Sequence, residues 1–167
     1  MKYTLSVLVE NQPGVLSKVS GLFSRRGFYI DSLAVGVTEI PSISRMTIVV
    51  DGDEYILEQV EKQLNKVIPV IKVKNLNETP GFISSELSLI KVSCNTKQRP
   101  EIMKIAELMM ARIVDVSLGS LTLQMADSPE KTETLLSLLK PYGIKEIVRT
   151  GTVAIENGAS ITKREKS

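Results

Sequence analysis

The apolar residues of this chain follow one order of elements twice: strand, helix, strand, strand, helix, strand. Residues 3–9 repeat apolar side chains every two positions, which predicts a strand covered on one face. Residues 15–23 repeat them every three or four positions, which predicts a helix that ends with Arg25 and Arg26 before Gly27. The other elements expected in this half are strands over 28–37 and 43–50, a helix over 56–67 and a strand over 70–76.

The same order returns after a run of turn-forming residues at 77–81. The elements expected there are a strand over 86–93, a helix near Pro100, strands over 113–116 and 121–125, a helix that opens around Pro129, and a last strand over 144–148. Asp127 and Glu130 are expected to form a capping pair at that helix start. This order is the split βαβ pattern, so the predicted fold class is α+β, with two tandem ferredoxin-like βαββαβ domains.

The predicted boundaries are a first domain over 1–76, a linker over 77–85, a second domain over 86–151 and a C-terminal extension over 152–167, whose end is expected to be mobile. A sheet with helices on one face leaves its other face and its edge strands in need of cover. Each half is also too short for a large core. We therefore expect a homodimer.

The composition excludes several classes of function. The chain has no histidine, so histidine-based acid–base catalysis and histidine metal sites are ruled out. The single Cys94 cannot form an internal disulfide, which favours a cytoplasmic protein. Net charge is +2 and 4% of the residues are aromatic, which disfavours a nucleic-acid-binding protein. No apolar run reaches the roughly 20 residues of a membrane helix. We expect no catalytic residue and no metal site.

Three smaller features each have two interpretations. Cys94 is a nucleophile or a buried small hydrophobe, and the missing histidine favours the second. Residues 51–54 (Asp-Gly-Asp-Glu) can be interpreted as a Mg²⁺ or Ca²⁺ site or as the start of a helix. The spacing lacks the further ligands of a calcium loop, which favours the helix start. Four methionines can be interpreted as the lining of a groove for a partner or as core residues, and the core is favoured. They are Met103, Met109, Met110 and Met125.

The loop over residues 10–16 is the best candidate for ligand binding. It leads from a strand into a helix with Gly14 at the entry, where free amides and the helix dipole favour a carboxylate. Asn11 has both donors and an acceptor, so it can bind a nearby ammonium group. A tight strand-to-helix turn explains the same residues equally well. The matching junction over 95–100 has no glycine, and we expect no ligand there.

The chain resembles the regulatory (small) subunit of acetohydroxyacid synthase, also called acetolactate synthase, over roughly residues 2–155. The matching segments in the first half are 5–11, 14–16, 21–28, 30–33, 44–48 and 58–64. In the second half they are 89–92, 111–116 and 149–151. In this family the first half is an ACT domain, a ferredoxin-like module that binds amino acids.

The resemblance implies a subunit without activity of its own. It implies a partner, the catalytic large subunit, which carries thiamine diphosphate, Mg²⁺ and FAD and makes acetolactate from pyruvate in branched-chain amino-acid biosynthesis. No cofactor is expected on this chain. The small subunit raises the activity of its partner and makes it sensitive to valine. The alternative is a stand-alone ACT-type amino-acid sensor that acts on a different enzyme.

The resemblance also implies a valine site between two chains of a dimer. Asn11 and the backbone of Gly14-Val15-Leu16 match the family's valine loop, and Tyr29-Ile30 would come from the second chain. Where the family commonly has asparagine, this chain has Tyr29. A phenol there would fill part of the pocket or replace an amide hydrogen bond.

Overall fold

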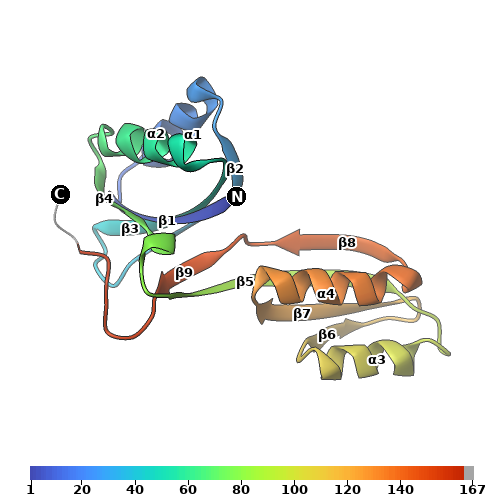
Figure 1. Cartoon of the computed structure of the whole chain (residues 1–167). Helices are drawn as coiled ribbons and strands as arrows, with labels where there is room; N and C mark the ends of the chain where they lie inside the picture. The colour runs from blue at the N-terminus through green and yellow to red at the C-terminus, as the bar shows by residue number, and fades with distance from the viewer. Residues whose placement is uncertain (164–167) are drawn as a thin grey trace. The chain divides into compact units, whose positions relative to one another are not determined.

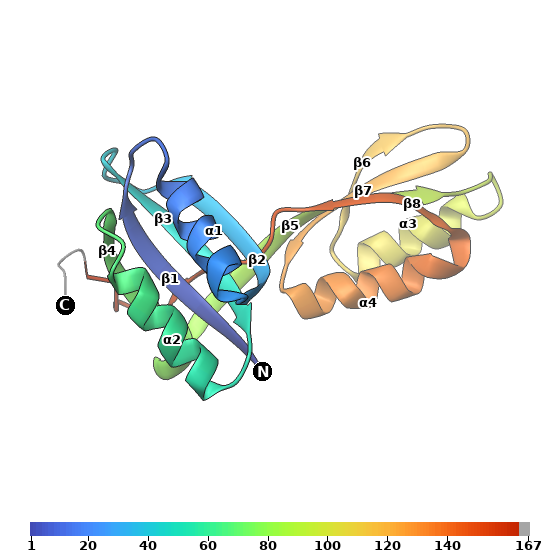
Figure 2. The same ribbon diagram turned by 90° about the horizontal axis from the view of Figure 1, so that it is seen from above.

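The computed structural model describes residues 1–163 and divides the chain into two compact units. The first unit holds Met1–Ile83 together with residues 152–163, and the second holds Ser84–Gly151. In each unit two helices cover one face of an antiparallel sheet (Figures 1 and 2). The predicted α+β class with two tandem ferredoxin-like domains is confirmed.

The first unit follows the predicted order of elements. They are β1 (Lys2–Glu10), α1 (Val15–Arg26), β2 (Tyr29–Val37), β3 (Ile43–Asp51), α2 (Glu54–Asn65), β4 (Val70–Asn75) and the short 3₁₀ helix η1 (Leu76–Glu78). The sheet order is β2-β3-β1-β4, so β1 is central and β2 is an edge strand. The helices cover the odd-numbered side chains of β1, and Leu5 and Val7 are fully buried there.

Strand β1 is buried on both faces, which differs from the predicted one-sided cover. Leu8, on the face away from the helices, is only 2% exposed. The reason is local: Leu76 of η1 and Ala154 of β9 (Val153–Glu156) are buried, and both of these elements lie against β1. The C-terminal extension therefore belongs to the first unit as far as it is described.

An ion pair holds this extension. Glu156 of β9 is 4% exposed and lies 2.8 Å from the ammonium of Lys74 on β4. The amide of Asn157 donates to the carbonyl of Gly81. The expected mobile end includes residues 164–167, which lie outside the described residues.

The second unit repeats the topology. Its elements are β5 (Phe82–Ser93), α3 (Arg99–Leu108), β6 (Arg112–Val116), β7 (Ser120–Asp127), α4 (Pro129–Leu139), the 3₁₀ helix η2 (Lys140–Tyr142) and β8 (Ile144–Arg149). The strand order is β6-β7-β5-β8, and β9 also pairs with β5. Its core includes Ile90, Ile102 and Leu135, all fully buried.

Two local predictions need correction. The segment expected to be a linker, 77–85, contains most of η1 and the start of β5, because the strand begins at Phe82 rather than Glu86. The cap of α4 is Ser128, whose hydroxyl accepts from the amide of Lys131; Asp127 lies one residue too early and accepts from the amide of Ser128. The predicted Asp127–Glu130 capping pair is wrong for that reason.

The C-terminal ends of α1 and α3 use different residues in the same left-handed conformation. Gly27 follows α1 with φ of 67°, and the basic Arg25 and Arg26 occupy the last turn, as predicted. Met110 takes the corresponding place after α3 with φ of 57°. A residue with a Cβ atom is disfavoured in this conformation.

Candidate functional site

The loop between β1 and α1 is held by the backbone of neighbouring turns. The amide of Glu10 donates to the carbonyl of Pro69, and the amide of Asn11 donates to that of Ser42. The side chain of Asn11 donates from Nδ2 to the carbonyl of Pro41 at 3.0 Å. The bond to Pro41 uses a donor of the Asn11 side-chain amide, so the Oδ1 oxygen of that side chain is left to accept a hydrogen bond.

Gly14 opens the helix and leaves its first amides free. It has φ of 84°, and no side chain caps α1. The first helical bond runs from the amide of Lys18 to the carbonyl of Gly14, so the amides of Leu16 and Ser17 have no partner among residues 1–163. A Cβ atom on Gly14 would meet no atom within 4 Å, so the place beside the loop is open. Free amides and the positive end of the helix dipole favour an anion here.

The structure brings Asn11, Gly14, Val15 and Leu16 together in one loop. Val15 is buried in the core, whereas Leu16 is 48% exposed beside the open amides. This loop could not have been located against residues 41 and 42 from the sequence alone, because that contact depends on the pairing of β1 with β3.

A single chain does not bring Tyr29 and Ile30 to this loop. Tyr29 pairs with Asp51, which pairs with Lys2 at the start of β1, whereas the loop follows the far end of β1. The eight steps from Lys2 to Glu10 span roughly 26 Å at about 3.3 Å per residue. In Figure 2, α1 runs from the loop toward the start of β2. Tyr29 is 65% exposed on an edge strand, and Ile30 packs partly against the core.

The equivalent junction of the second unit is closed by its own side chains. The amide of Asn95 donates to Oε1 of Gln98, and the amide of Gln98 donates to Oδ1 of Asn95. The side chain of Arg99 donates to the carbonyl of Ser117 at 3.0 Å. This reciprocal bonding leaves fewer free backbone amides for a ligand to bind.

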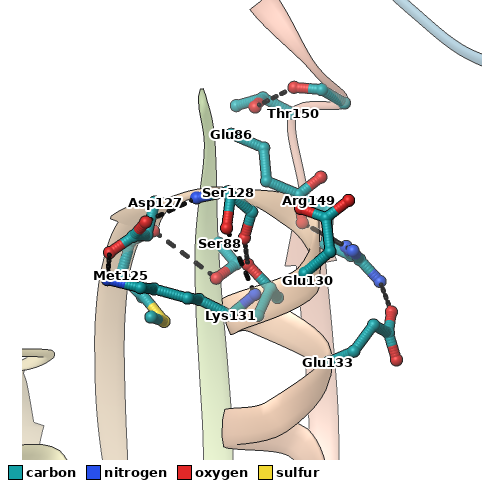
Figure 3. Close-up of polar contacts among 12 residues, drawn as sticks. Glu86, Ser88, Met125, Asp127, Ser128, Glu130, Lys131, Glu133, Arg149 and Thr150 are labelled. Atoms are coloured by element: carbon teal, nitrogen blue, oxygen red, sulfur yellow. Dashed lines mark hydrogen bonds and ion pairs between the residues drawn. The ribbon is translucent and has the colours of Figure 1, made fainter. Parts of the chain in front are cut away.

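The second unit contains an ionic cluster that joins β5, α4 and β8 (Figure 3). Arg149 lies between Glu86, which is 4% exposed, and Glu133, and each guanidinium–carboxylate pair is at 2.6 Å. Burial lowers the pKa of Arg149, but hydrogen bonds to Glu133 and Glu86 outweigh it and the net pKa is raised. A permanently charged arginine and its two carboxylates form a structural anchor rather than acid–base machinery.

The smaller candidate features have structural roles. Cys94 is buried. Asp53 caps α2 by accepting from the amide of Ile56 at 2.8 Å, as predicted for a helix start. Among residues 1–163, no group of three or more acidic or cysteine side chains could hold a metal ion, and no helix is long and apolar enough to cross a membrane.

The methionines do not share one role. Met125 is buried in the core and Met109 packs partly against it, as predicted. Met103 and Met110 are 49% and 84% exposed, so core filler is wrong for these two. Both lie on or just after α3, on its solvent side.

Comparison with known proteins accounts for both halves of the chain. Residues 5–72 match the model of an AHAS small subunit-like ACT domain, and residues 85–158 match the model for the small subunit of acetolactate synthase. The acetolactate synthase small subunit of Mycolicibacterium smegmatis is 53% identical over 93% of this chain and 91% of its own length. The chain belongs to the acetolactate synthase small-subunit family.

Further relatives support this assignment to the regulatory subunit. A probable acetolactate synthase small subunit of Archaeoglobus fulgidus is 49% identical over 95% of this chain and 98% of its own length. The crystal structure of the small subunit from Thermotoga maritima is 37% identical, with a TM-score of 0.88 over 96% of this chain and 99% of that one. The family and the ACT-type fold of the first half, both expected from the resemblance, are confirmed.

Proposed function

We propose that this small subunit activates the catalytic large subunit of acetolactate synthase and makes it sensitive to feedback inhibition by valine. The observation that carries the proposal is the open start of α1, where Gly14 has a positive φ and no side chain caps the helix. Membership of the small-subunit family supplies the partner. In this proposal the chain contributes no catalytic residue and no cofactor, and thiamine diphosphate, Mg²⁺ and FAD are carried by the large subunit.

Valine would bind at the loop through both of its charged groups. The amides of Leu16 and Ser17 would hold the carboxylate, where the helix dipole adds favourable charge. The Oδ1 oxygen of Asn11 would accept from the ammonium group, since its Nδ2 already donates to Pro41. This division of roles lets one short loop bind a zwitterion.

The apolar side of the site requires a homodimer. Tyr29 and Ile30 begin an edge strand at the far end of β1 from the loop, so they can reach it only from a second chain. The isopropyl group would pack against them and against the exposed Leu16. Valine bound between two chains would regulate the large subunit because it favours one dimer arrangement over another, and only differential affinity shifts an equilibrium.

Reconstitution with the large subunit tests this function. Adding the chain should raise the rate of acetolactate formation, and valine should then lower it. The Gly14→Asp variant should still activate but lose the valine response, whereas Gly14→Asn, which adds the same bulk without charge, should keep part of it. An unchanged rate on addition of the chain would contradict activation. Retained valine binding in that case would indicate a sensor for another enzyme.

A further inference from the structure

The sheet of the second unit has one face that is left exposed. Its helices α3 and α4 lie on one side of the sheet (Figure 2), where Ile90 and Val92 of β5 are buried in the core. Side chains alternate along a strand, so Leu89 points to the opposite side. Val148 of β8 pairs with Leu89 there. We call this side the outer face, and define it by Leu87, Leu89, Lys91, Thr122, Glu146 and Val148.

The first unit covers the corresponding face with its own chain. The pairing of β1 with β4 shifts register after Leu8, and the pairing of β5 with β8 shifts after Lys91. These shifts mark equivalent places, so Ser6 corresponds to Leu89. Ser6 is polar yet fully buried, whereas Leu89 is apolar yet 38% exposed. The more apolar of the two faces is therefore the one without cover, and exposed apolar patches mark interaction surfaces.

The outer face has a shape and a chemistry that a second surface can fit. A depression of about 230 Å³ lies on it, lined by Leu89, Val148 and Thr122 together with Lys91 and Glu146. The ammonium of Lys91 lies 3.9 Å from the carboxylate of Glu146. That distance is too long for a hydrogen bond, so both charged groups can still bond to a partner.

The charges of the outer face indicate which partner it fits. Lys91 and Glu146 carry opposite charges, and so do Arg112 and Asp115, which are exposed on the neighbouring strand β6. A strongly acidic or basic partner would meet two like charges on such a surface. A second copy of the same surface would not, because a two-fold contact brings residue i to j and residue j to i. The outer face is therefore complementary to itself.

We propose that the outer face binds the outer face of a second copy of this chain, sheet against sheet. Leu89 and Val148 would pack at the centre, and Lys91 would pair with Glu146 of the partner subunit. Two sheets packed in this way lie about 10 Å apart, which these side chains can fill. The contact goes beyond the proposed function, since the valine site uses the edge strand β2 of the first unit, and it does not depend on valine.

Two charge variants of the full chain test the pairing. Lys91→Glu gives the outer face two adjacent glutamates, and Glu146→Lys gives it two adjacent lysines. Each alone should self-associate at least about tenfold more weakly than the natural chain in sedimentation experiments without valine, because like charges then meet. Mixed in equal amounts, with one chain isotopically labelled, they should form mixed dimers well above the roughly half expected by chance. Native mass spectrometry counts these dimers. A chance proportion of mixed dimers would overturn the proposal.

The apolar centre has its own test. Leu89→Asn should weaken self-association at least about tenfold, because it places an amide in a contact that excludes water. The matched control is Leu138→Asn, which changes an exposed leucine of α4 and should leave self-association unchanged. Circular dichroism checks that both variants fold. The charge variants alter exposed side chains, so they test the contact even if Leu89→Asn does not fold.

Assembly with the large subunit separates the other occupant of this face. If Leu89→Asn leaves self-association unchanged but weakens that assembly, the outer face binds the large subunit and the proposal is wrong. The charge variants leave the valine loop intact, and Gly14→Asp leaves the outer face intact. Failure of this proposal is therefore distinguishable from failure of the valine site.

Discussion

The two strand–helix junctions of this chain occupy equivalent places in two copies of one fold, but their backbone amides differ in their hydrogen-bond partners. At the first, Gly14 leaves the start of α1 without a side-chain cap. At the second, no side chain caps α3 either, but Asn95 and Gln98 bond to each other's amides and the amide of Arg99 donates to the carbonyl of Asn95. A shared topology therefore does not imply a shared site. The chemistry depends on whether the junction satisfies its own amides.

The C-terminal ends of α1 and α3 also differ, but there the second unit has the less favourable residue. The first unit places Gly27 where the left-handed conformation is required, and the second places Met110 there. The second unit, with the closed junction, thus carries local strain on an exposed side chain, whereas the first has an unstrained cap and an open junction. The two units are differently specialised at both ends of their first helices.

The largest expected effect concerns the anchor of the second unit. Arg149→Met would leave the carboxylate of Glu86 buried without its partner, and we expect a loss of about 3 kcal/mol in the free energy of unfolding. Urea denaturation, with hydrogen exchange of the β5 and β8 amides as the local readout, measures it. Glu133→Gln is the control: its side chain is 63% exposed, so the loss should stay below about 1 kcal/mol. Equal losses in the two variants would contradict a buried anchor.

A negative charge placed at the junction between β1 and α1 should weaken valine binding. Gly14→Asp would face the carboxylate of valine with its own, and we expect calorimetry to show affinity reduced at least about a hundredfold, or about 2.7 kcal/mol. Gly14→Asn is the matched control, since asparagine also tolerates the left-handed conformation. If both variants bind valine as the natural chain does, the loop is not the site.

Exchanging the helix-end residues sharpens the comparison between the units. Met110→Gly should stabilise the second unit by about 1 kcal/mol, because it relieves a positive φ at a residue that is 84% exposed. Gly27→Met should destabilise the first unit by a similar amount. Thermal unfolding followed by calorimetry measures both, and a destabilising Met110→Gly would show that the side chain makes a contact that outweighs its strain.

The smallest effect depends on pH. The pKa of Glu61 in the folded chain lies above its ordinary 4.5, so the folded state holds this proton more tightly than the unfolded state does. Its contribution to stability therefore falls as the pH rises from about 4.5 through the folded pKa. Glu61→Gln should be more stable than the natural chain at pH 7, by less than about 1 kcal/mol in this partly exposed setting, and the difference should shrink below pH 4.5. Denaturation at several pH values checks the trend, and a difference that grows toward low pH would have the wrong sign.

Sequence patterns predicted the order of the elements because each strand and helix carries its own apolar period. They did not predict that β1 is buried on both faces, since Leu8 is covered by η1 and β9 from distant parts of the chain. The loop at Asn11 and Gly14 was predicted from local chemistry and family resemblance. Its support by Pro41 was not, because that contact depends on strand pairing.

The acidic face of α2 shows the same limit. The spacing of Glu54, Glu58 and Glu61 predicts one acidic helix face. Glu78 and Tyr3 join that face only through the arrangement of η1 and β1. A local pattern therefore shows which side chains share a helix face, but not which distant residues lie beside that face.

The most direct test of an open first junction and a closed second one is a valine titration of the ¹⁵N-labelled chain followed by amide chemical shifts. We predict saturable shifts of the Leu16 and Ser17 amides, with the amides of Gln98 and Arg99 unmoved. Shifts at the second junction, or none at the first when valine is in excess, would contradict the account.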